Sequence, residues 1–78
     1  MHYVYILQDA VDKLYFGYSN ELKQRIGNHA RGEVSTTKTY REPRFIWYCA
    51  FTNKKKALNF EKYLKAGSGH AFARKHLI

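Results

Sequence analysis

The sequence predicts a small α/β (α+β) domain, in which a three-stranded antiparallel sheet is flanked by helices in the order β-β-α-β-α-α. Three apolar runs, at 3–7, 13–18 and 44–51, have the composition of strands. Two further segments repeat apolar residues at helical spacing. All 78 residues, 1–78, are expected to form one domain, because a chain of this length cannot hold two independent cores.

The first two strands are expected to form a hairpin around the polar stretch QDAVD. In the predicted register Val4 lies opposite Phe16, which puts Tyr5 opposite Tyr15. Side chains alternate between the two faces of a sheet, so the faces would differ in character. The apolar face would carry Val4, Ile6, Leu14 and Phe16, and the other face Tyr3, Tyr5, Tyr15 and Gly17.

The segment SNELKQRIGNHARG is expected to be a helix that Ser19 or Asn20 caps and that ends near Gly32. Its apolar stripe, at i, i+4 and i+8, consists of Leu22, Ile26 and Ala30. A glycine within a helix costs about 1 kcal/mol relative to alanine. Gly27 therefore suggests a close approach by another segment.

The second half of the chain is expected to hold one strand and two helices. After a polar, basic loop that ends at Pro43, the run RFIWYCAF is apolar at almost every position, which is typical of a strand covered on both faces. A helix should follow over 52–67, with Thr52 or Asn53 as its N-cap and Gly67 at its end. Residues 70–78 are expected to form a short closing helix.

The net charge indicates the kind of partner. Fourteen Lys and Arg residues against six acids give a formal charge of +8. Such a field favours nucleic acid or another polyanion, although a basic surface can also serve solubility alone. Binding to a membrane is disfavoured, because no helix sets a broad apolar face against a basic one.

The cysteine count and the N-terminus favour a cytoplasmic protein. With one cysteine, Cys49, the chain can form neither an internal disulfide nor a cysteine-based zinc site. The start MHYVYILQDA lacks the features of a signal peptide. The longest apolar run, FIWYCAF, is too short to span a bilayer.

One carboxylate lies on an apolar helix face. Ala57, Phe60 and Leu64 share a face of the second helix, and Glu61 lies within it. A carboxylate there must be paired, bound to a metal or placed at the margin of the core. Three interpretations therefore stay open: a salt bridge to Arg25, a marginal position, or a ligand for a divalent cation.

Four further side chains could join this carboxylate. Arg25 and His29 are four residues apart and project together from the first helix, at the edge of the core or as a solvated polar edge. Tyr5 and Tyr15 would form a cross-strand aromatic pair, which commonly just stabilises a sheet. If all of these faced one cavity, they would supply a proton acceptor, phosphate-binding groups and a metal ligand, as phosphodiester cleavage requires.

The order and spacing of these residues resemble those of the GIY-YIG nuclease superfamily. YVYIL is similar to the first strand motif, with Tyr5 as its tyrosine. LYFGYS is similar to the second, with Tyr15 and with Gly17, which is expected to permit a close approach at the cleft. Arg25 has the family's spacing from the second tyrosine, and His29 stands where a histidine is frequent.

The resemblance covers nearly the whole chain. The segment 43–51 is similar to a strand of small stand-alone members, and ALNFEKYLK to the helix that carries the metal-binding glutamate, here Glu61. Tyr3 replaces the first glycine of the family name, and Phe16 replaces the second isoleucine. Tyr18 stands where many members carry a lysine or another polar residue, which leaves one phosphate contact open.

The resemblance implies hydrolysis of DNA phosphodiester bonds with a single divalent cation, Mg²⁺ or Mn²⁺, held by Glu61. Tyr5 would be the general base, and Tyr15 would orient water or phosphate. His29 would contact phosphate or assist proton transfer. Free tyrosine has a pKa near 10, so a nearby cation must favour the phenolate. Arg25 suits that task and could also stabilise charge developing on the phosphoryl group.

Contacts to the DNA backbone are expected from basic residues elsewhere in the chain. The candidates, for which a merely solvated surface is the alternative, are Lys38, Arg41, Lys54, Lys55 and Lys56. Such contacts position a substrate without reading its bases, so low sequence specificity is expected. The setting would be DNA repair or recombination, with RNA left open as a substrate. Two other functions remain: a catalytically silent nucleic-acid-binding module of the same fold, and a protein-interaction domain.

Overall fold

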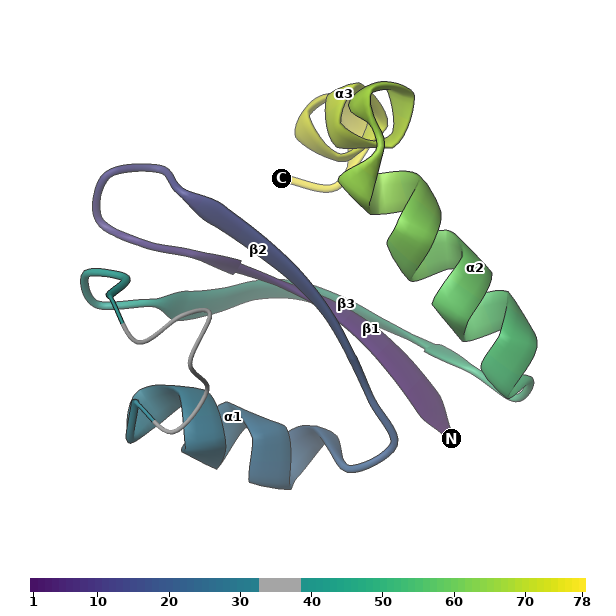
Figure 1. Cartoon of the computed structure of the whole chain (residues 1–78), viewed down its shortest axis with the longest axis horizontal. Coiled ribbons are helices and arrows are strands. Elements are labelled where there is room, and N and C mark those ends of the chain that lie inside the picture. Colours follow the sequence, from purple (N-terminus) through teal and green to yellow (C-terminus); the bar gives the residue numbers. More distant parts are fainter. Residues whose placement is uncertain (33–38) are drawn as a thin grey trace.

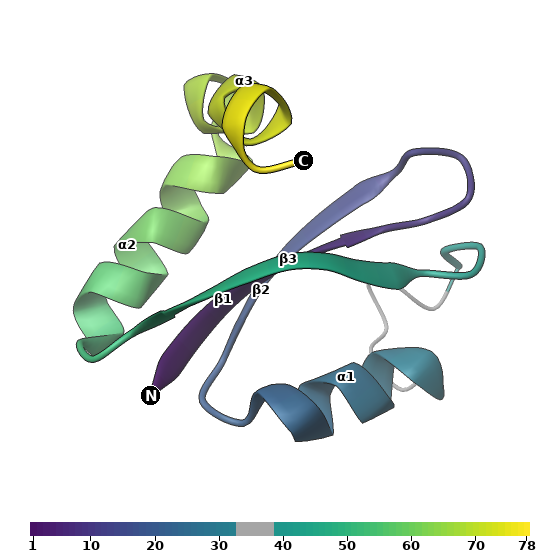
Figure 2. The same ribbon diagram turned by 180° about the vertical axis from the view of Figure 1, so that it is seen from behind.

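The computed structural model describes residues 1–32 and 39–78. In chain order its elements are β1 (His2–Gln8), β2 (Leu14–Ser19), α1 (Leu22–Ala30), β3 (Arg44–Phe51), α2 (Lys54–Lys65) and α3 (Gly67–His76). The strands form one antiparallel sheet in the order β2-β1-β3. The predicted fold class and element order are confirmed. Figure 1 and the reverse view in Figure 2 show α1 on one side of the sheet and α2 with α3 on the other.

The central strand is the most deeply buried element. Four consecutive residues of β1, Val4 to Leu7, are at most 1% exposed. Alternation along the strand divides them between two environments. Val4 and Ile6 join the apolar core with Phe16 of β2 and with α2 and α3. Tyr5 lies on the opposite face, where its hydroxyl meets α1. The sheet thus separates an aliphatic core from a layer that holds polar side chains.

The hairpin register differs from the predicted one by two residues. Tyr5 lies opposite Gly17 rather than Tyr15, and Ile6 lies opposite Phe16. Because side chains repeat every second residue along a strand, a shift by two leaves each side chain on its predicted face. The strands continue to the pair Gln8 and Leu14, so the turn comprises residues 9–13 rather than the predicted stretch QDAVD, residues 8–12.

A buried aspartate closes that turn. Asp9 is 2% exposed, and its Oδ1 accepts hydrogen bonds from the backbone N–H groups of Val11 at 3.0 Å and Lys13 at 2.8 Å. Its Oδ2 accepts from the backbone N–H of Arg41 at 3.3 Å, and the N–H of Ala10 donates to the carbonyl of Arg41. Asp9 therefore joins the hairpin turn to the segment before β3.

Helix α1 begins later than the sequence suggested. The N-cap position is Glu21, and no side chain caps the helix there. Ser19 and Asn20 were wrongly expected to cap it, because the Ser19 hydroxyl instead accepts at 2.9 Å from the backbone N–H of Glu21, the N-cap residue itself. Among residues 1–32 and 39–78, the atoms nearest to a Cβ on Gly27 belong to the Arg31 guanidinium of the same helix, at 3.0 Å, so no other described segment makes the close approach suggested there.

The second helix agrees with the prediction, and the third begins earlier. Asn53 caps α2, with its side chain accepting from the backbone N–H of Lys56 at 3.0 Å. Gly67 is the first residue of α3 rather than the end of α2. A Cβ on Gly69 would overlap the carbonyl of Tyr63, so the two helices cross too closely for any side chain at this position.

Strand β3 lies at an edge of the sheet and is not covered on both faces as expected. Its alternate residues Trp47 and Phe51 pack on Phe60 of α2, with ring centroids 6.2 and 5.8 Å apart. The other face is partly open, and Tyr48 is 59% exposed. The strand covered on both faces is β1, which lies between the other two.

Candidate functional site

The side chain of Tyr5 crosses the neighbouring strand at a glycine. Tyr5 is fully buried on β1, and its cross-strand partner is Gly17 of β2. A Cβ built on Gly17 would overlap the phenol ring and hydroxyl of Tyr5. The glycine therefore leaves room for the ring to lie over β2, with the hydroxyl directed toward α1.

The hydroxyl of Tyr5 is hydrogen-bonded to α1. The Tyr5 oxygen lies 2.9 Å from Nε2 of His29, and His29 is 4% exposed. The His29 ring also meets Tyr15 of β2 edge-on, with centroids 5.1 Å apart. Tyr5, Tyr15 and His29 thus form one buried cluster, although two strands and a helix supply them.

The pKa values in this cluster favour neutral groups. Burial raises the pKa of Tyr5 well above its ordinary value, and neighbouring Tyr15 adds to the rise. Burial, and after it the charge of Arg25, lowers the pKa of His29. Near neutral pH the pair is therefore a phenol and a neutral imidazole. When Nε2 of His29 carries no proton, the phenol donates the hydrogen bond.

The expectation that Arg25 would favour a tyrosine phenolate is only half right. The charge of Arg25 does lower the pKa of Tyr5, but burial has the larger effect, and the net pKa is raised. Desolvation disfavours the charged form of a buried phenol more than one nearby guanidinium favours it. In this structure Tyr5 is harder to ionise than a free tyrosine.

Glu61 approaches the cluster from the other helical layer. Its side chain is 17% exposed on α2 and forms an ion pair with Lys65 at 3.5 Å. The alternative of a salt bridge between Glu61 and Arg25 does not appear among the described residues, since the carboxylate pairs one turn along its own helix. The negative charge of Glu61 nevertheless raises the pKa of Tyr5, while that of Arg25 lowers it.

The five predicted site residues therefore fall into two groups, one in direct contact and one acting only electrostatically. Tyr5, Tyr15 and His29 are in direct contact, and Arg25 and Glu61 lie near enough to affect the Tyr5 hydroxyl electrostatically. Within residues 1–32 and 39–78 no group of three or more His, Cys, Asp or Glu side chains could hold a metal. One carboxylate suits Mg²⁺, which usually keeps several waters and takes one or two carboxylates together with phosphate oxygens.

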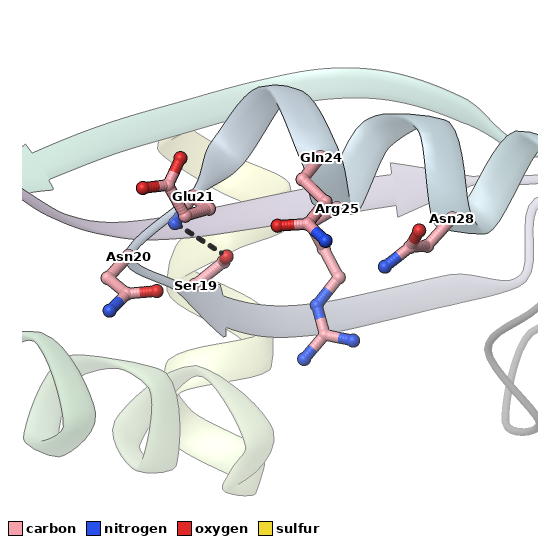
Figure 3. A pocket seen from close by; sticks show the side chains of 6 residues that line it. All are labelled: Ser19, Asn20, Glu21, Gln24, Arg25 and Asn28. Atoms are coloured by element: carbon pink, nitrogen blue, oxygen red, sulfur yellow. Dashed lines mark hydrogen bonds between the residues drawn. The ribbon is translucent and has the colours of Figure 1, made fainter.

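An open polar pocket adjoins the site on α1. Its volume is about 220 Å³, and its lining residues, drawn in Figure 3, are Ser19, Asn20, Glu21, Gln24, Arg25 and Asn28. Figure 3 shows the Arg25 side chain extending from α1 to the level of β2. The Glu21 carboxylate points to the opposite side of the helix from this guanidinium. Arg25 thus connects the pocket to the Tyr5 cluster.

Tyr18 does not join the Tyr5 cluster. It lies on the opposite face of β2, where it packs against the apolar core. Its hydroxyl is 2.8 Å from Nδ1 of His2, and the two rings stack with centroids 6.1 Å apart. The Tyr18 side chain is therefore engaged by His2 of β1 on the face opposite the Tyr5 cluster.

Two aromatic neighbours of the site were not singled out from the sequence. Phe45 of β3 stacks on Tyr5 with centroids 4.9 Å apart. Tyr40 meets Tyr15 edge-on at 6.4 Å and donates a hydrogen bond to the Leu14 carbonyl at 3.1 Å. Strict alternation would place Phe45 on the face of Trp47 and Phe51, but the register shift opposite Ile6 and Leu7 turns it toward Tyr5. Tyr40 lies in a segment without periodicity, so no sequence signal indicated it.

Of the residues expected to contact DNA, those that the structure describes lie in two places, on α2 and beside the hairpin turn. Lys54, Lys55 and Lys56 are all exposed in the first turn of α2. Lys54 and Lys55 line an open pocket of about 480 Å³ together with Glu61. Arg41 is exposed beside the hairpin turn that Asp9 closes. Lys38 lies outside the described residues.

Comparison with known proteins gives the family. Residues 1–74 match the GIY-YIG catalytic domain. The chain belongs to the GIY-YIG family. Within it the chain is similar to small UPF0213 proteins. One, from Clostridium perfringens (strain 13 / Type A), is 36% identical over 66 residues, which cover 83% of this chain and 71% of that protein.

Two further UPF0213 proteins are similar to this GIY-YIG chain. A UPF0213 protein of Streptococcus pyogenes (strain Manfredo) is 34% identical over 64 residues, which cover 81% of this chain and 70% of the relative. The solution structure of a UPF0213 protein from Bacillus halodurans has a TM-score of 0.60 at 28% identity, covering 95% of this chain and 82% of that one. No helix in the described part of the chain is long and apolar enough to cross a membrane.

Proposed function

We propose that this GIY-YIG domain is a divalent-metal-dependent endonuclease that hydrolyses DNA phosphodiester bonds with low sequence specificity. The observation that carries the proposal is the Tyr5–His29 hydrogen bond of 2.9 Å, with Arg25 and Glu61 acting electrostatically on the same hydroxyl. Hydrolysis of a phosphodiester requires a proton acceptor, a cation and a carboxylate, which Tyr5, Arg25 and Glu61 would supply from β1, α1 and α2. The +8 charge suits a polyanionic substrate.

The raised pKa of Tyr5 defines how the tyrosine would serve as a base. A phenol that has not ionised accepts a proton from water only as it releases its own. His29, whose pKa is lowered, is neutral and lies within hydrogen-bonding distance to receive that proton at Nε2. The attacking water thus loses a proton to the Tyr5 oxygen while the phenol proton moves to His29.

Arg25 and Tyr15 have supporting roles in this proposal. The guanidinium of Arg25 would bind the phosphoryl oxygens and offset the negative charge that develops as water attacks. Tyr15, packed on both Tyr5 and His29, would orient the water or the phosphate. Lys54, Lys55, Lys56 and Arg41 would contact neighbouring phosphates without reading bases.

Glu61 would hold the one cation, Mg²⁺ or Mn²⁺. When bound, such a cation neutralises a phosphate oxygen and stabilises the departing 3′ oxygen. Glu61 fits this use because its carboxylate is half-buried and its charge affects the pKa of Tyr5. Its ion-pair partner, Lys65, is exposed, so water can replace the lysine. Exposed ion pairs of this kind contribute only about 0–1 kcal/mol, so the metal can displace the lysine.

The test is a cleavage assay on branched, nicked, single-stranded and duplex DNA, with and without Mg²⁺ or Mn²⁺. We expect metal-dependent cleavage by the wild type and loss of about a hundredfold or more in Glu61→Gln. The matched control is Glu42→Gln, at an exposed position before β3, which should cleave at the wild-type rate. Equal rates for the Glu61 variant and the wild type would contradict the metal assignment.

A second candidate is a module that binds nucleic acid without cutting it. The observation in its favour is the raised pKa of Tyr5, which keeps the supposed base protonated. Binding that needs no metal, falls steeply with salt, and leads to no cleavage with any cation would support this candidate. In either case we propose that residues 1–78 act as one domain in the cytoplasm, in DNA repair or recombination.

A further inference from the structure

A row of carboxamides lies on α1 and the segment just before it, beside the candidate active site. Asn20, Gln24 and Asn28 are spaced four residues apart and all line the pocket that Arg25 also lines. Figure 3 shows the Gln24 and Asn28 amides on the helix and the Asn20 amide on the segment that leads into it. Gln24 and Asn28, four residues apart, lie on one face of α1. Asn20 precedes the helix and extends this polar wall of the pocket.

The chemistry of this wall differs from that of a phosphate site. Phosphates are bound by cations and by N–H donors, whereas each carboxamide offers both a donor and an acceptor. Paired donors and acceptors match the edges of nucleobases, and Asn or Gln can bind adenine with two hydrogen bonds. Arg25 is the cation of the pocket, and the carboxylate of Glu21 points away from it.

The spacing of the row favours an unstacked strand. Four residues of α-helix rise by about 6 Å. Bases within one strand of duplex DNA follow one another at about 3.4 Å, so Gln24 and Asn28 are too far apart along α1 for successive stacked bases. Unpaired bases, by contrast, can be separated and hydrogen-bonded along their Watson–Crick and Hoogsteen edges.

We propose that Asn20, Gln24 and Asn28 form a base-binding subsite for an unpaired nucleotide, with adenine preferred, next to the phosphate that Arg25 would bind. The proposal rests on the proposed nuclease function, because that function makes Arg25 a phosphate ligand. A subsite of this size selects one position only, which is compatible with low overall sequence specificity. It directs the enzyme to single-stranded segments, such as those in branched or damaged DNA.

One contact already orients a member of the row. The carbonyl oxygen of Asn28 accepts a hydrogen bond from the guanidinium of Arg31 at 2.8 Å. This contact fixes which end of the amide faces away from Arg31, so the NH₂ group becomes the donor half. Asn20 and Gln24 are exposed, and they can be replaced without disturbing the buried cluster of Tyr5, Tyr15 and His29.

The test measures binding rather than cleavage. Short labelled single strands of dA, dC and dT are titrated by fluorescence anisotropy, in EDTA and at one fixed salt concentration. The wild type should bind dA about five- to tenfold more tightly than dC or dT, at the lower end of what a carboxamide pair discriminates. Asn20→Ala/Gln24→Ala should lose this preference and keep the melting temperature of the wild type.

The control and the contradicting results are equally specific. Lys23→Ala, at an exposed position on α1 that does not line this pocket, should weaken binding to all three strands by the same factor or leave it unchanged. Equal affinity of the wild type for dA, dC and dT, retention of the preference in the double variant, or no binding to any strand would each overturn the inference. A failure of the nuclease proposal appears separately, as absence of cleavage with Mg²⁺ or Mn²⁺ while the base preference persists.

Discussion

The hydroxyl of Tyr5 and Nε2 of His29 lie 2.9 Å apart in a buried contact between the central strand and α1. Neither residue could make this contact without Gly17, over which the phenol ring passes. In this contact the pKa of the phenol is raised and the pKa of the imidazole is lowered, so both groups favour their neutral forms. It is the feature from which the proposed chemistry follows.

A side chain at Gly17 should displace Tyr5. In Gly17→Ala the added methyl group would overlap the phenol ring of the fully buried Tyr5. We expect a loss of about 1–3 kcal/mol in the free energy of unfolding, as for other overpacked cores. Cleavage should fall more than the folded fraction explains. The measurements are urea denaturation and the cleavage rate of the folded protein.

Gly27→Ala provides a matched control. Gly27 lies in α1. Among the described residues, a Cβ at this position meets only the flexible end of the Arg31 side chain, at 3.0 Å. This variant should gain about 0.5–1 kcal/mol, because alanine favours a helix more than glycine does. A Gly17→Ala protein as stable and active as Gly27→Ala would contradict the close approach of Tyr5.

The crossing of α2 and α3 depends on a second glycine. A Cβ on Gly69 would overlap the backbone carbonyl of Tyr63, which cannot turn aside as a flexible side chain can. Gly69→Ala should lower the free energy of unfolding by about 3 kcal/mol, at the upper end of overpacking costs. Gly67→Ala is the control, since no atom lies within 4 Å of a Cβ at that position. Thermal unfolding followed by circular dichroism distinguishes the two, and equal melting temperatures would show that the helices can separate at no cost.

The acidic side of the pH profile should report His29. Its pKa is lowered in the folded protein, chiefly by burial, so folding favours the neutral imidazole. The resulting stability is fully present above the unfolded pKa near 6.5 and is lost as the pH falls through the lower folded value. Cleavage should fall in the same range, because a protonated His29 cannot accept the proton of Tyr5. Rates measured between neutral and mildly acidic pH should show this limb in the wild type, and its persistence in His29→Gln would assign it to another group.

Asp9 should govern stability at a lower pH. Burial opposes its ionised form, but hydrogen bonds from the backbone N–H groups of Lys13, Arg41 and Val11 outweigh burial, and the pKa of Asp9 is lowered. Its contribution to stability is therefore present above the unfolded pKa near 3.9 and is lost as the pH falls through the folded value. Asp9→Asn should be less stable at neutral pH and should lose less on acidification, as acid titrations of unfolding would show. Asp12→Asn, at an exposed position of the same turn, is the control.

Patterning predicted the faces of the sheet better than it predicted the pairing. Every residue of the hairpin lies on its expected face, because a shift by two preserves alternation. The observed turn is held by Asp9, which accepts hydrogen bonds from the backbone of Val11 and Lys13. Asp9 also accepts one from the backbone of Arg41, which is distant in the sequence, so the pattern of neighbouring residues could not indicate it. The same limit explains β3, since its apolar run does not reveal which strand occupies the centre of the sheet.

The motif residues were predictable, and their electrostatics were not. Spacing along strands and helices indicated Tyr5, Tyr15, His29 and Arg25, because local geometry sets those directions. Burial of the Tyr5 hydroxyl depends on contacts from three elements at once, so the rise in its pKa could be seen only in the folded chain. The partner of Glu61 is Lys65 of the same helix, at the i, i+4 spacing that the sequence already contains.

The most direct test of the proposed function compares Tyr5→Phe with Tyr63→Phe in single-turnover cleavage of DNA with Mg²⁺. Phenylalanine keeps the packing of each ring and removes only the hydroxyl, and Tyr63 is exposed on α2. We predict that Tyr5→Phe cleaves about 10²–10⁴-fold more slowly than the wild type, the usual contribution of a general base, while Tyr63→Phe is unchanged. A Tyr5→Phe protein that cleaves at the wild-type rate would contradict the proposed role of the Tyr5–His29 pair.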